Sequence, residues 1–221
     1  MKICILIPVY NESRTIGSLV QKLREKRLDV LVIDDGSNDN SALLAQSQGA
    51  KVIRHEKNKG KGESLKEGFA YALEKGYEGV LTMDGDGQHD VADIKNFLDE
   101  VKKNPVSVIT GNRMTDPYGM PKVRYLTNRF MSRLISLACG QNVPDTQCGY
   151  KYIGCEVLKN IHLTSGDFEI ETEILMKASK KKYKIVSVPI QTIYRDEESK
   201  INPFKDTLRF IVYFVRELCS P

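Results

Sequence analysis

The sequence predicts an α/β fold in which helices flank a Rossmann-like, mostly parallel sheet. β-rich runs and helix-like runs alternate four times between residues 2 and 83, and a polar or glycine-containing cluster follows most of the β-rich runs. Alternation of this kind predicts right-handed crossovers between parallel strands. The length of 221 residues suits one sizeable domain with a terminal appendage.

The first half of the chain supplies four expected strands. They cover residues 2–9, 28–33, 52–54 and 79–83. Apolar residues at the spacing of one buried helix face predict a helix between the first two strands: Ile16, Leu19, Val20 and Leu23. Ser13 is placed to cap that helix. A short helix closed by Gly49 follows, and then a longer one that runs from the loop 58–62 to a stop at Gly76.

The second half continues the alternation less regularly. The expected elements are a helix at 91–101, a strand at 106–110, a helix at 123–139, a turn into a strand at 143–151, a helix at 168–178 and a strand at 185–194. Pro189 interrupts the last strand, which indicates an edge or a bulge. The segment 204–218 is amphipathic and predicts a helix that packs on the core or lies at a membrane interface. We therefore expect a catalytic domain at 1–202 and a C-terminal amphipathic helix at 203–221.

Polar clusters fall at the ends of the first strands or in the loops just after them. They are Asn11 with Glu12, Asp34 with Asp35, the loop 58–62, and Asp84 with Asp86. Because the carboxyl ends of parallel strands share one edge of a sheet, these clusters are expected to converge on one crevice.

The pair of aspartates is the most informative of these clusters. Asp84 and Asp86 follow a buried strand in a glycine-rich turn, and two carboxylates this close repel each other unless a cation lies between them. A hard divalent ion that shares its oxygen ligands with substrate phosphates is the natural candidate. Gln88 can add a neutral oxygen ligand. The stretch predicts a metal site that grips a nucleotide diphosphate.

Other structures also contain Asp-Gly turns. A solvated turn is the simplest of them. A calcium loop fits badly, because His89 holds its glycine position and Lys95 the place of its bidentate glutamate. A phosphoaspartyl hydrolase is a closer alternative, but Gln88 stands where such enzymes carry Thr or Ser, and the similar stretch 34–39 lies before this one rather than after it.

The composition is that of a globular protein, with 41% hydrophobic and 28% charged residues. The net charge of +4 suits an anionic substrate or an anionic membrane face, and no nucleic-acid signature accompanies it. Five scattered cysteines without a C-x-x-C pair indicate reduced thiols. The chain begins directly with a strand and has no apolar run near the roughly 20 residues that cross a bilayer. We expect a cytoplasmic protein, peripheral on the membrane face.

Four motifs in this order and spacing resemble family 2 glycosyltransferases with the GT-A fold. They are residues 7–12 (IPVYNE), 32–37 (VIDDGS), 58–62 (NKGKG) and 84–88 (DGDGQ). Later motifs resemble the polyprenyl-phosphate branch of that family, typified by dolichyl-phosphate mannose synthase: residues 111–113 (GNR), 145–151 (DTQCGYK), 168–171 (FEIE) and Arg195 followed by Ser199-Lys200. The resemblance covers nearly the whole chain.

The resemblance implies an inverting, metal-dependent enzyme that moves a hexose from a UDP- or GDP-sugar to a polyprenyl phosphate such as dolichyl or undecaprenyl phosphate. The residues implied in nucleotide-sugar binding are Pro8, Tyr10, Glu12, Asp35, Lys61 and Asp84. Those implied in binding Mg²⁺ or Mn²⁺ are Asp84, Asp86 and Gln88.

The acceptor phosphate is already an anion, so it needs positioning and charge compensation more than deprotonation. Basic side chains should surround it. They are Arg113, Arg195, Lys200 and one of Arg124 and Arg129. The implied catalytic residues are Asp86, Arg113, Glu171, Arg195 and Lys200. Glu169 and Glu171 would contact sugar hydroxyls or orient Arg195.

The sequence also departs from the family pattern. Acidic residues 196–198 precede the Ser199-Lys200 pair, where relatives usually have glycine. Many relatives carry C-terminal transmembrane helices, so three sources of the membrane contact stay open: a separate anchor, the segment 203–221, or helices that follow this sequence in a longer protein. Two other functions stay open: transfer to a saccharide or protein hydroxyl with Glu169 or Glu171 as base, and a catalytically silent nucleotide-binding module that recruits a membrane partner.

Overall fold

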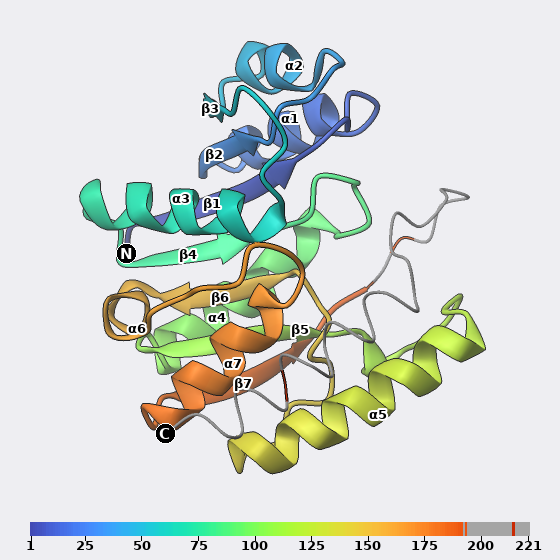
Figure 1. Cartoon of the computed structure of the whole chain (residues 1–221). Helices are drawn as coiled ribbons and strands as arrows, with labels where there is room; N and C mark the ends of the chain where they lie inside the picture. The colour runs from blue at the N-terminus through green and yellow to red at the C-terminus, as the bar shows by residue number, and fades with distance from the viewer. Residues whose placement is uncertain (192, 194–213, 215–221) are drawn as a thin grey trace.

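The computed structural model describes residues 1–191, 193 and 214. Within this part of the chain, seven strands form one sheet in the order β3-β2-β1-β4-β6-β5-β7, and helices cover both of its faces (Figure 1). The mostly parallel α/β fold expected from the sequence is confirmed. Arg195, Lys200 and nearly all of the expected helix 203–221 lie outside the described residues.

The strands alternate with helices through most of the chain. The strands are β1 (Ile3–Val9), β2 (Asp29–Asp34), β3 (Lys51–Arg54), β4 (Gly79–Thr82), β5 (Ser107–Asn112), β6 (Lys151–Gly154) and β7 (Lys184–Pro189). The helices are α1 (Ile16–Glu25), α2 (Ser41–Ser47), α3 (Lys61–Glu74), α4 (Ile94–Lys103), α5 (Lys122–Cys139), α6 (Cys155–Asn160) and α7 (Ile170–Lys180), with short 3₁₀ turns η1 (Val91–Asp93) and η2 (Arg113–Thr115).

Two apolar layers hold the helices to the sheet. Side chains of α3, α5, α6 and α7 fill one face, and those of α1, α2 and α4 fill the other. The strands serve both layers because successive side chains point to opposite faces. In β1, for example, Leu6 packs in the first layer, whereas Ile5 and Ile7 pack in the second. A sheet covered on both sides needs strands of nearly continuous apolar residues, as β1 and β2 have.

Strand β6 is antiparallel to both of its neighbours, β4 and β5, and was expected only as a strand after a turn. Its register pairs Lys151 with Thr82, the last residue of β4, so it brings the segment before β6 beside the Asp84 turn. Gly79 is required at the other end of this pairing, because a Cβ there would lie 2.3 Å from the ring of Tyr152.

Three local expectations were wrong. Thr15, not Ser13, is the N-cap residue of α1, and the backbone N–H of Ser13 donates to Asp39 instead. The last strand ends at Pro189 rather than Tyr194, since proline has no N–H to continue the pairing. Helix α6 was not anticipated, because its six residues are too few to show a helical period. Among the described residues, no helix is long and apolar enough to cross a membrane.

Candidate active site

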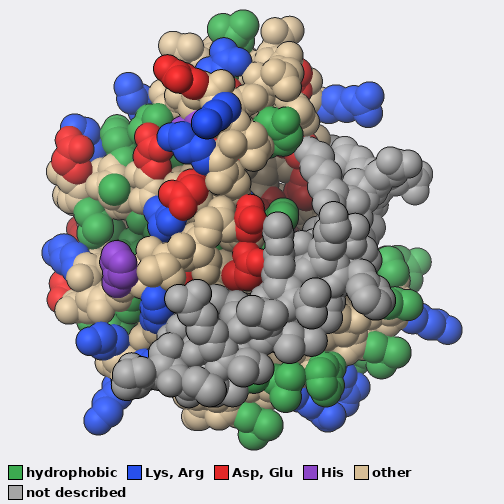
Figure 2. Space-filling model, in the orientation of Figure 1, with side chains coloured by type: hydrophobic (Ala, Val, Ile, Leu, Met, Phe, Trp, Pro, Cys, Tyr) green, Lys and Arg blue, Asp and Glu red, His purple; other side chains and the backbone are tan. Residues whose placement is uncertain are grey.

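The strand-end clusters predicted from the sequence meet at one edge of the sheet. The backbone N–H of Asp35 donates to Val9 O (2.8 Å), and the N–H of Asn11 donates to Ser37 Oγ (2.9 Å), so the loops after β1 and β2 lie together. Thr15 Oγ1 donates to Gly85 O (2.6 Å) and connects the start of α1 to the loop after β4. Figure 2 shows acidic side chains around a recess in the middle of this view of the molecule.

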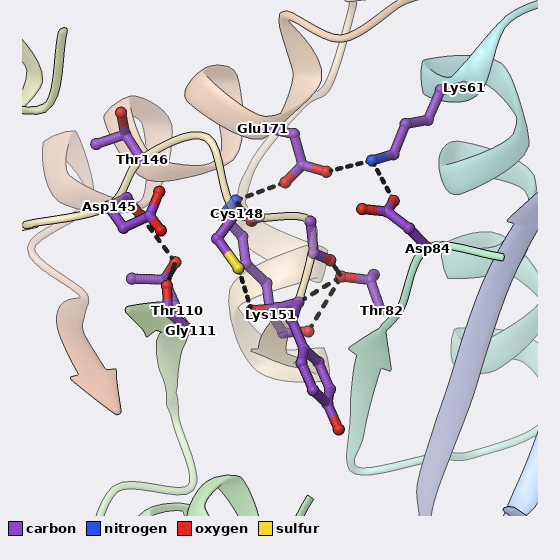
Figure 3. A network of polar contacts seen from close by, with 12 residues as sticks. Lys61, Thr82, Asp84, Thr110, Gly111, Asp145, Thr146, Cys148, Lys151 and Glu171 are labelled. Carbon is purple, nitrogen blue, oxygen red and sulfur yellow. Dashed lines mark hydrogen bonds and ion pairs between the residues drawn. The ribbon is translucent and has the colours of Figure 1, made fainter. Parts of the chain in front are cut away.

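Four charged side chains of alternating sign run through the site, in the order Asp84, Lys61, Glu171, Lys151; we call them the charge chain (Figure 3). Lys61 Nζ lies 2.6 Å from Asp84 Oδ1 and 3.1 Å from Glu171 Oε1. Lys151 Nζ donates to Glu171 Oε2 (2.6 Å) and to the backbone oxygen of Cys148. Each member comes from a different element: the loop after β4, the start of α3, the first turn of α7 and the start of β6.

The charge chain keeps its acidic members ionised. Burial alone would raise the pKa of Glu171, but Lys151 and Lys61 outweigh it and lower that pKa. Burial likewise opposes the ionised form of Asp84, and Lys61 does most to lower its pKa below the usual range. A carboxylate with a lowered pKa is a weak base, so Glu171 is better suited to hold lysines than to take a proton.

The carboxylate of Asp84 is also fixed by packing. A Cβ on Gly149 would lie 2.5 Å from Asp84 Oδ2, so only glycine leaves room for that oxygen. The N–H of Asp84 donates to His89 Nδ1 (3.2 Å), and the ring of His89 stacks on Tyr150 with centroids 4.8 Å apart. Burial lowers the pKa of His89 to about 4, which keeps its ring neutral at physiological pH.

Asp86, in contrast, lies outside the charge chain. Burial and the nearby charge of Asp84 raise its pKa to about 6, and Glu12 adds to the effect. Its Oδ1 accepts the backbone N–H of Gln88 (2.9 Å). A carboxylate pushed toward neutrality by two other acids fits a divalent cation, which would relieve that repulsion.

The protein groups alone do not complete a metal shell. Over the described ranges, no cluster of three or more His, Cys, Asp or Glu side chains is arranged to hold a metal. Asp84 and Asp86 would therefore supply two carboxylates, and the remaining ligands would come from Gln88, water or a substrate diphosphate. That division matches magnesium and manganese sites that are shared with phosphates.

The residues expected to bind the nucleotide take different positions. Pro8 is half-buried in β1, Tyr10 is 38% exposed, and Glu12 is half-buried. Asp35 is buried and accepts the backbone N–H groups of Lys59 (2.8 Å) and Gly60 (2.9 Å), so it shapes the loop before α3.

His55 supports that arrangement from behind. Its Nδ1 lies 2.6 Å from Asp35 Oδ1, and its Nε2 lies 2.7 Å from Glu67 Oε2 on α3. The ring thus joins the loop after β2 to the helix that carries Lys61.

Arg113 is buried in a second polar network, and its charge also helps to lower the pKa of Asp84. Its Nε and Nη2 donate to the two oxygens of Asp145 at 2.7 and 2.9 Å, and its backbone N–H donates to the same carboxylate. Asn128 of α5 also donates to Asp145 (2.8 Å). The expected acceptor-phosphate ligand is therefore 5% exposed and held in a bidentate ion pair.

Sequence reasoning gave no role to three residues that shape the site: Lys151, Asp145 and His89. Lys151 and Asp145 stand in the motif 145–151, which was used only as a mark of resemblance. A lysine in a strand is an unusual signal in itself, because lysine is almost never fully buried without a partner. His89 carried no comparable signal, since its stacking partner lies 61 positions further along the chain.

The doubly covered, mostly parallel sheet with its acidic loop after β4 defines the GT-A class of glycosyltransferase folds. The family model of glycosyl transferase family 2 matches residues 4–161, and the chain belongs to that family. It is a glycosyltransferase.

Curated relatives agree with this assignment, and solved structures share the fold. The chain is 34% identical over 209 residues to glycosyltransferase AglJ of Haloferax volcanii, covering 92% of this chain and 68% of the relative. It is 30% identical over 217 residues to a UDP-N-acetylglucosamine–dolichyl-phosphate N-acetylglucosaminyltransferase of Methanococcus voltae, covering 88% and 86%. In fold it is similar to glucosyl-3-phosphoglycerate synthase of Mycobacterium tuberculosis in complex with Mn²⁺, UDP and product (TM-score 0.77, 17% identity, 100% and 81% covered).

Proposed function

We propose that the protein transfers a hexose from a nucleotide sugar to a polyprenyl phosphate, with inversion at the anomeric carbon, at a membrane surface. Two of the supports are the relative from Methanococcus voltae, whose name gives a dolichyl-phosphate acceptor, and the acidic site after β4. The observation that carries the choice of a lipid acceptor is the outer face of α5.

Helix α5 exposes apolar and basic side chains together. Val123, Leu126, Phe130 and Leu137 are between 62% and 81% exposed. At 100° per residue they share one side of the helix with the exposed residues Lys122, Arg129 and Arg133. The helix contains no Asp or Glu. Where Figure 1 places α5, Figure 2 shows hydrophobic side chains beside Lys and Arg.

A helix face of this composition fits an anionic bilayer surface. Apolar side chains enter the headgroup region, and the cations beside them meet lipid phosphates. A soluble acceptor would give no reason for four large apolar side chains to remain in water. The inner side of the same helix carries Asn128, which bonds the carboxylate that holds Arg113. The membrane face and the expected acceptor-phosphate ligand are therefore joined through one helix.

A groove beside α5 offers space for the lipid. Its volume is about 620 Å³, and it lies between the helix and the segment 142–144. Met114, Leu137 and Val143 give it an apolar wall, and Arg129 and Arg133 are the charged residues of its lining. A groove with an apolar wall and two arginines suits the first isoprene units of a lipid that ends in a phosphate.

The chemistry requires little from a base. An oxygen of the acceptor phosphate attacks the anomeric carbon from the side opposite the leaving group, the bond to the diphosphate breaks, and a nucleoside diphosphate departs. A bound Mg²⁺ or Mn²⁺ would neutralise the charge that grows on the departing diphosphate. Asp84 and Asp86 would hold that ion, and Glu12 and Tyr10 would contact the nucleoside. Arg195 and Lys200, named from the sequence alone, would compensate the acceptor charge, because the charge of Arg113 is already balanced by Asp145.

Release of nucleoside diphosphate tests the proposal. The protein is incubated with Mn²⁺, a panel of UDP- and GDP-sugars and a short polyprenyl phosphate, and compared with 3-phosphoglycerate as acceptor. We expect product only when the acceptor is the lipid phosphate. NMR should show that the anomeric configuration of the transferred sugar is opposite to that of the donor. Turnover with 3-phosphoglycerate, or with a hydroxyl acceptor and no lipid phosphate, would refute the lipid assignment.

The α5 face is tested separately with vesicles. Phe130→Gln and Leu126→Gln together should reduce sedimentation with anionic phospholipid vesicles by about tenfold, since each removes apolar area from the interface. Leu43→Gln, at an exposed leucine of α2 (65%), is the matched control and should bind as the wild type does. Equal loss in the control, or binding that is indifferent to lipid charge, would contradict a specific α5 contact.

A further inference from the structure

Lys61 is the closest ion-pair partner of Asp84 in the described part of the chain. Its Nζ lies 2.6 Å from Asp84 Oδ1, whereas His89 Nε2 lies 3.7 Å from Asp84 Oδ2 and belongs to a neutral ring. The side chain of Lys61 is 16% exposed and that of Asp84 is 31% exposed, so water screens the contact only in part. The carboxylate expected to bind a metal therefore already has a resident cation.

That cation and a divalent ion compete for the same carboxylate. Two positive charges at neighbouring positions in a partly buried site repel each other strongly. The backbone of Gly149 lies on the side of Asp84 Oδ2, where an added Cβ would be 2.5 Å from that oxygen, and Lys61 holds Oδ1. A metal that approaches Asp84 is thus opposed by Lys61 unless Lys61 moves.

Glu171 provides the position to which Lys61 can move. Its Oε1 is 3.1 Å from Lys61 Nζ, and that oxygen is otherwise buried without a hydrogen-bond donor. Its other oxygen, Oε2, is held by the fully buried Lys151. Lys61 can therefore leave Asp84 without losing all its ionic contact, and its remaining N–H groups are then available to another anion.

We propose that Lys61 is the counter-ion of Asp84 in the metal-free enzyme and moves from it to Glu171 and the substrate diphosphate when metal and nucleotide bind. The metal alone displaces Lys61 without offering it a new partner, and so binds weakly. The diphosphate supplies both ligands to the metal and an acceptor to Lys61. Lys61 thereby couples the two binding events, and the coupling must be reciprocal.

This inference rests on the proposed nucleotide-sugar chemistry but not on the acceptor. Mn²⁺ binding, followed by the EPR signal of the free ion, is measured with and without UDP for the wild type, Lys61→Met and Lys59→Met. Lys59 is the matched control, because it lies two positions away in the same loop, is exposed and carries the same charge. It reports the general effect of removing one positive charge near the site.

The expected result is specific to Lys61. Without UDP, Lys61→Met should bind Mn²⁺ about tenfold more tightly than the wild type, and the factor by which UDP tightens Mn²⁺ binding should shrink by about the same amount. Lys59→Met should stay within about twofold of the wild type, because exposed charges at this distance are screened by salt. Unchanged or weaker Mn²⁺ binding in Lys61→Met, or an equal gain in Lys59→Met, would overturn the exchange.

A crystal structure of the wild type with Mg²⁺ and UDP gives a readout that does not depend on the variant folding. Lys61 Nζ should lie beyond hydrogen-bond distance of Asp84 and within it of Glu171 and a diphosphate oxygen. If Lys61 stays on Asp84 while the metal is bound, it is a structural ion pair and the inference is wrong. If the protein binds no Mn²⁺ under any condition, both the proposed metal site and the exchange of Lys61 are refuted. If Mn²⁺ and UDP bind normally but no lipid phosphate is glycosylated, only the proposed acceptor is refuted.

Discussion

The buried lysine of the charge chain gives the sharpest test of how the site is held together. Lys151 is fully buried, and its Nζ is 2.6 Å from Glu171 Oε2. Replacing it with Met keeps a side chain of similar length and apolar character but removes the charge. Glu171 is then left in a buried position with Lys61 as its remaining cation at 3.1 Å.

The expected loss of stability in Lys151→Met depends on the charges that remain around Glu171. Removing one partner of a buried ion pair generally costs about 3–5 kcal/mol, because the other charge stays buried without compensation. Lys61 compensates part of the charge of Glu171, so we expect a loss near the lower end, about 3 kcal/mol. The double variant Lys151→Met with Glu171→Gln removes both charges. Its loss of unfolding free energy should be smaller than the sum of the losses in the two single variants, by about 1 kcal/mol or more.

The assay is urea unfolding followed by circular dichroism, with a chelator present so that metal does not bind the acidic site. Lys159→Met is the control, because Lys159 belongs to an exposed pair with Glu156 and should change stability by no more than about 0.5 kcal/mol. A loss in Lys151→Met as small as that of the control, or strict additivity in the double variant, would show that the charge chain does not stabilise the fold.

Two further predictions concern the groups around Asp84 and Arg113. Gly149→Ala places a Cβ 2.5 Å from an oxygen of Asp84 and should lower turnover by about 100-fold with the fold retained, whereas Gly17→Ala, whose Cβ would lie 3.7 Å from its nearest neighbour, should keep full activity. Burial opposes ionisation of Asp145, but Arg113 lowers its pKa below the ordinary 3.8, so the pair stabilises the fold above that pH and loses this effect as the pH falls through the lowered value. Asp145→Asn should therefore be less stable than the wild type by about 3 kcal/mol near pH 7, with a difference that narrows in urea titrations once the pH falls below the ordinary 3.8; a constant difference would contradict the ionic origin.

The sequence was sufficient to predict the parallel part of the sheet and the place of the site. Period and spacing are local signals, and β1, β2 and β4 carry them in full, so their ends and the clusters at Glu12, Asp35 and Asp84 could be located in advance. The convergence of those clusters followed from the shared edge at the carboxyl ends of parallel strands rather than from any single motif. The nucleotide-binding roles of these residues stay predictions.

The antiparallel strand and the ion pairs could not be predicted in the same way. Whether β6 enters between β4 and β5 or lies at an edge depends on contacts between distant segments, such as the ring of Tyr152 over Gly79. The same pairing decides that Lys151 points to Glu171, twenty positions away. Arg113 was expected to be available to a phosphate, and its bidentate partner Asp145 is 32 positions further along the chain. No periodic signal links residues at such separations.

The arrangement of charge leaves uncompensated acidic groups at one end of the candidate site only. Within the charge chain, two carboxylates and two lysines alternate, so each buried charge has a partner of opposite sign and the desolvation of one is offset by the other. Asp86 and Glu12 lie beyond that balance, and the pKa of Asp86 is raised to about 6 by burial first and then by the negative charges of Asp84 and Glu12. A lysine added at this end would pair with this surplus of negative charge permanently and exclude substrate. Under the proposed function, a divalent ion that bound with the diphosphate would compensate the same surplus while the donor is bound, held by Asp84 and Asp86.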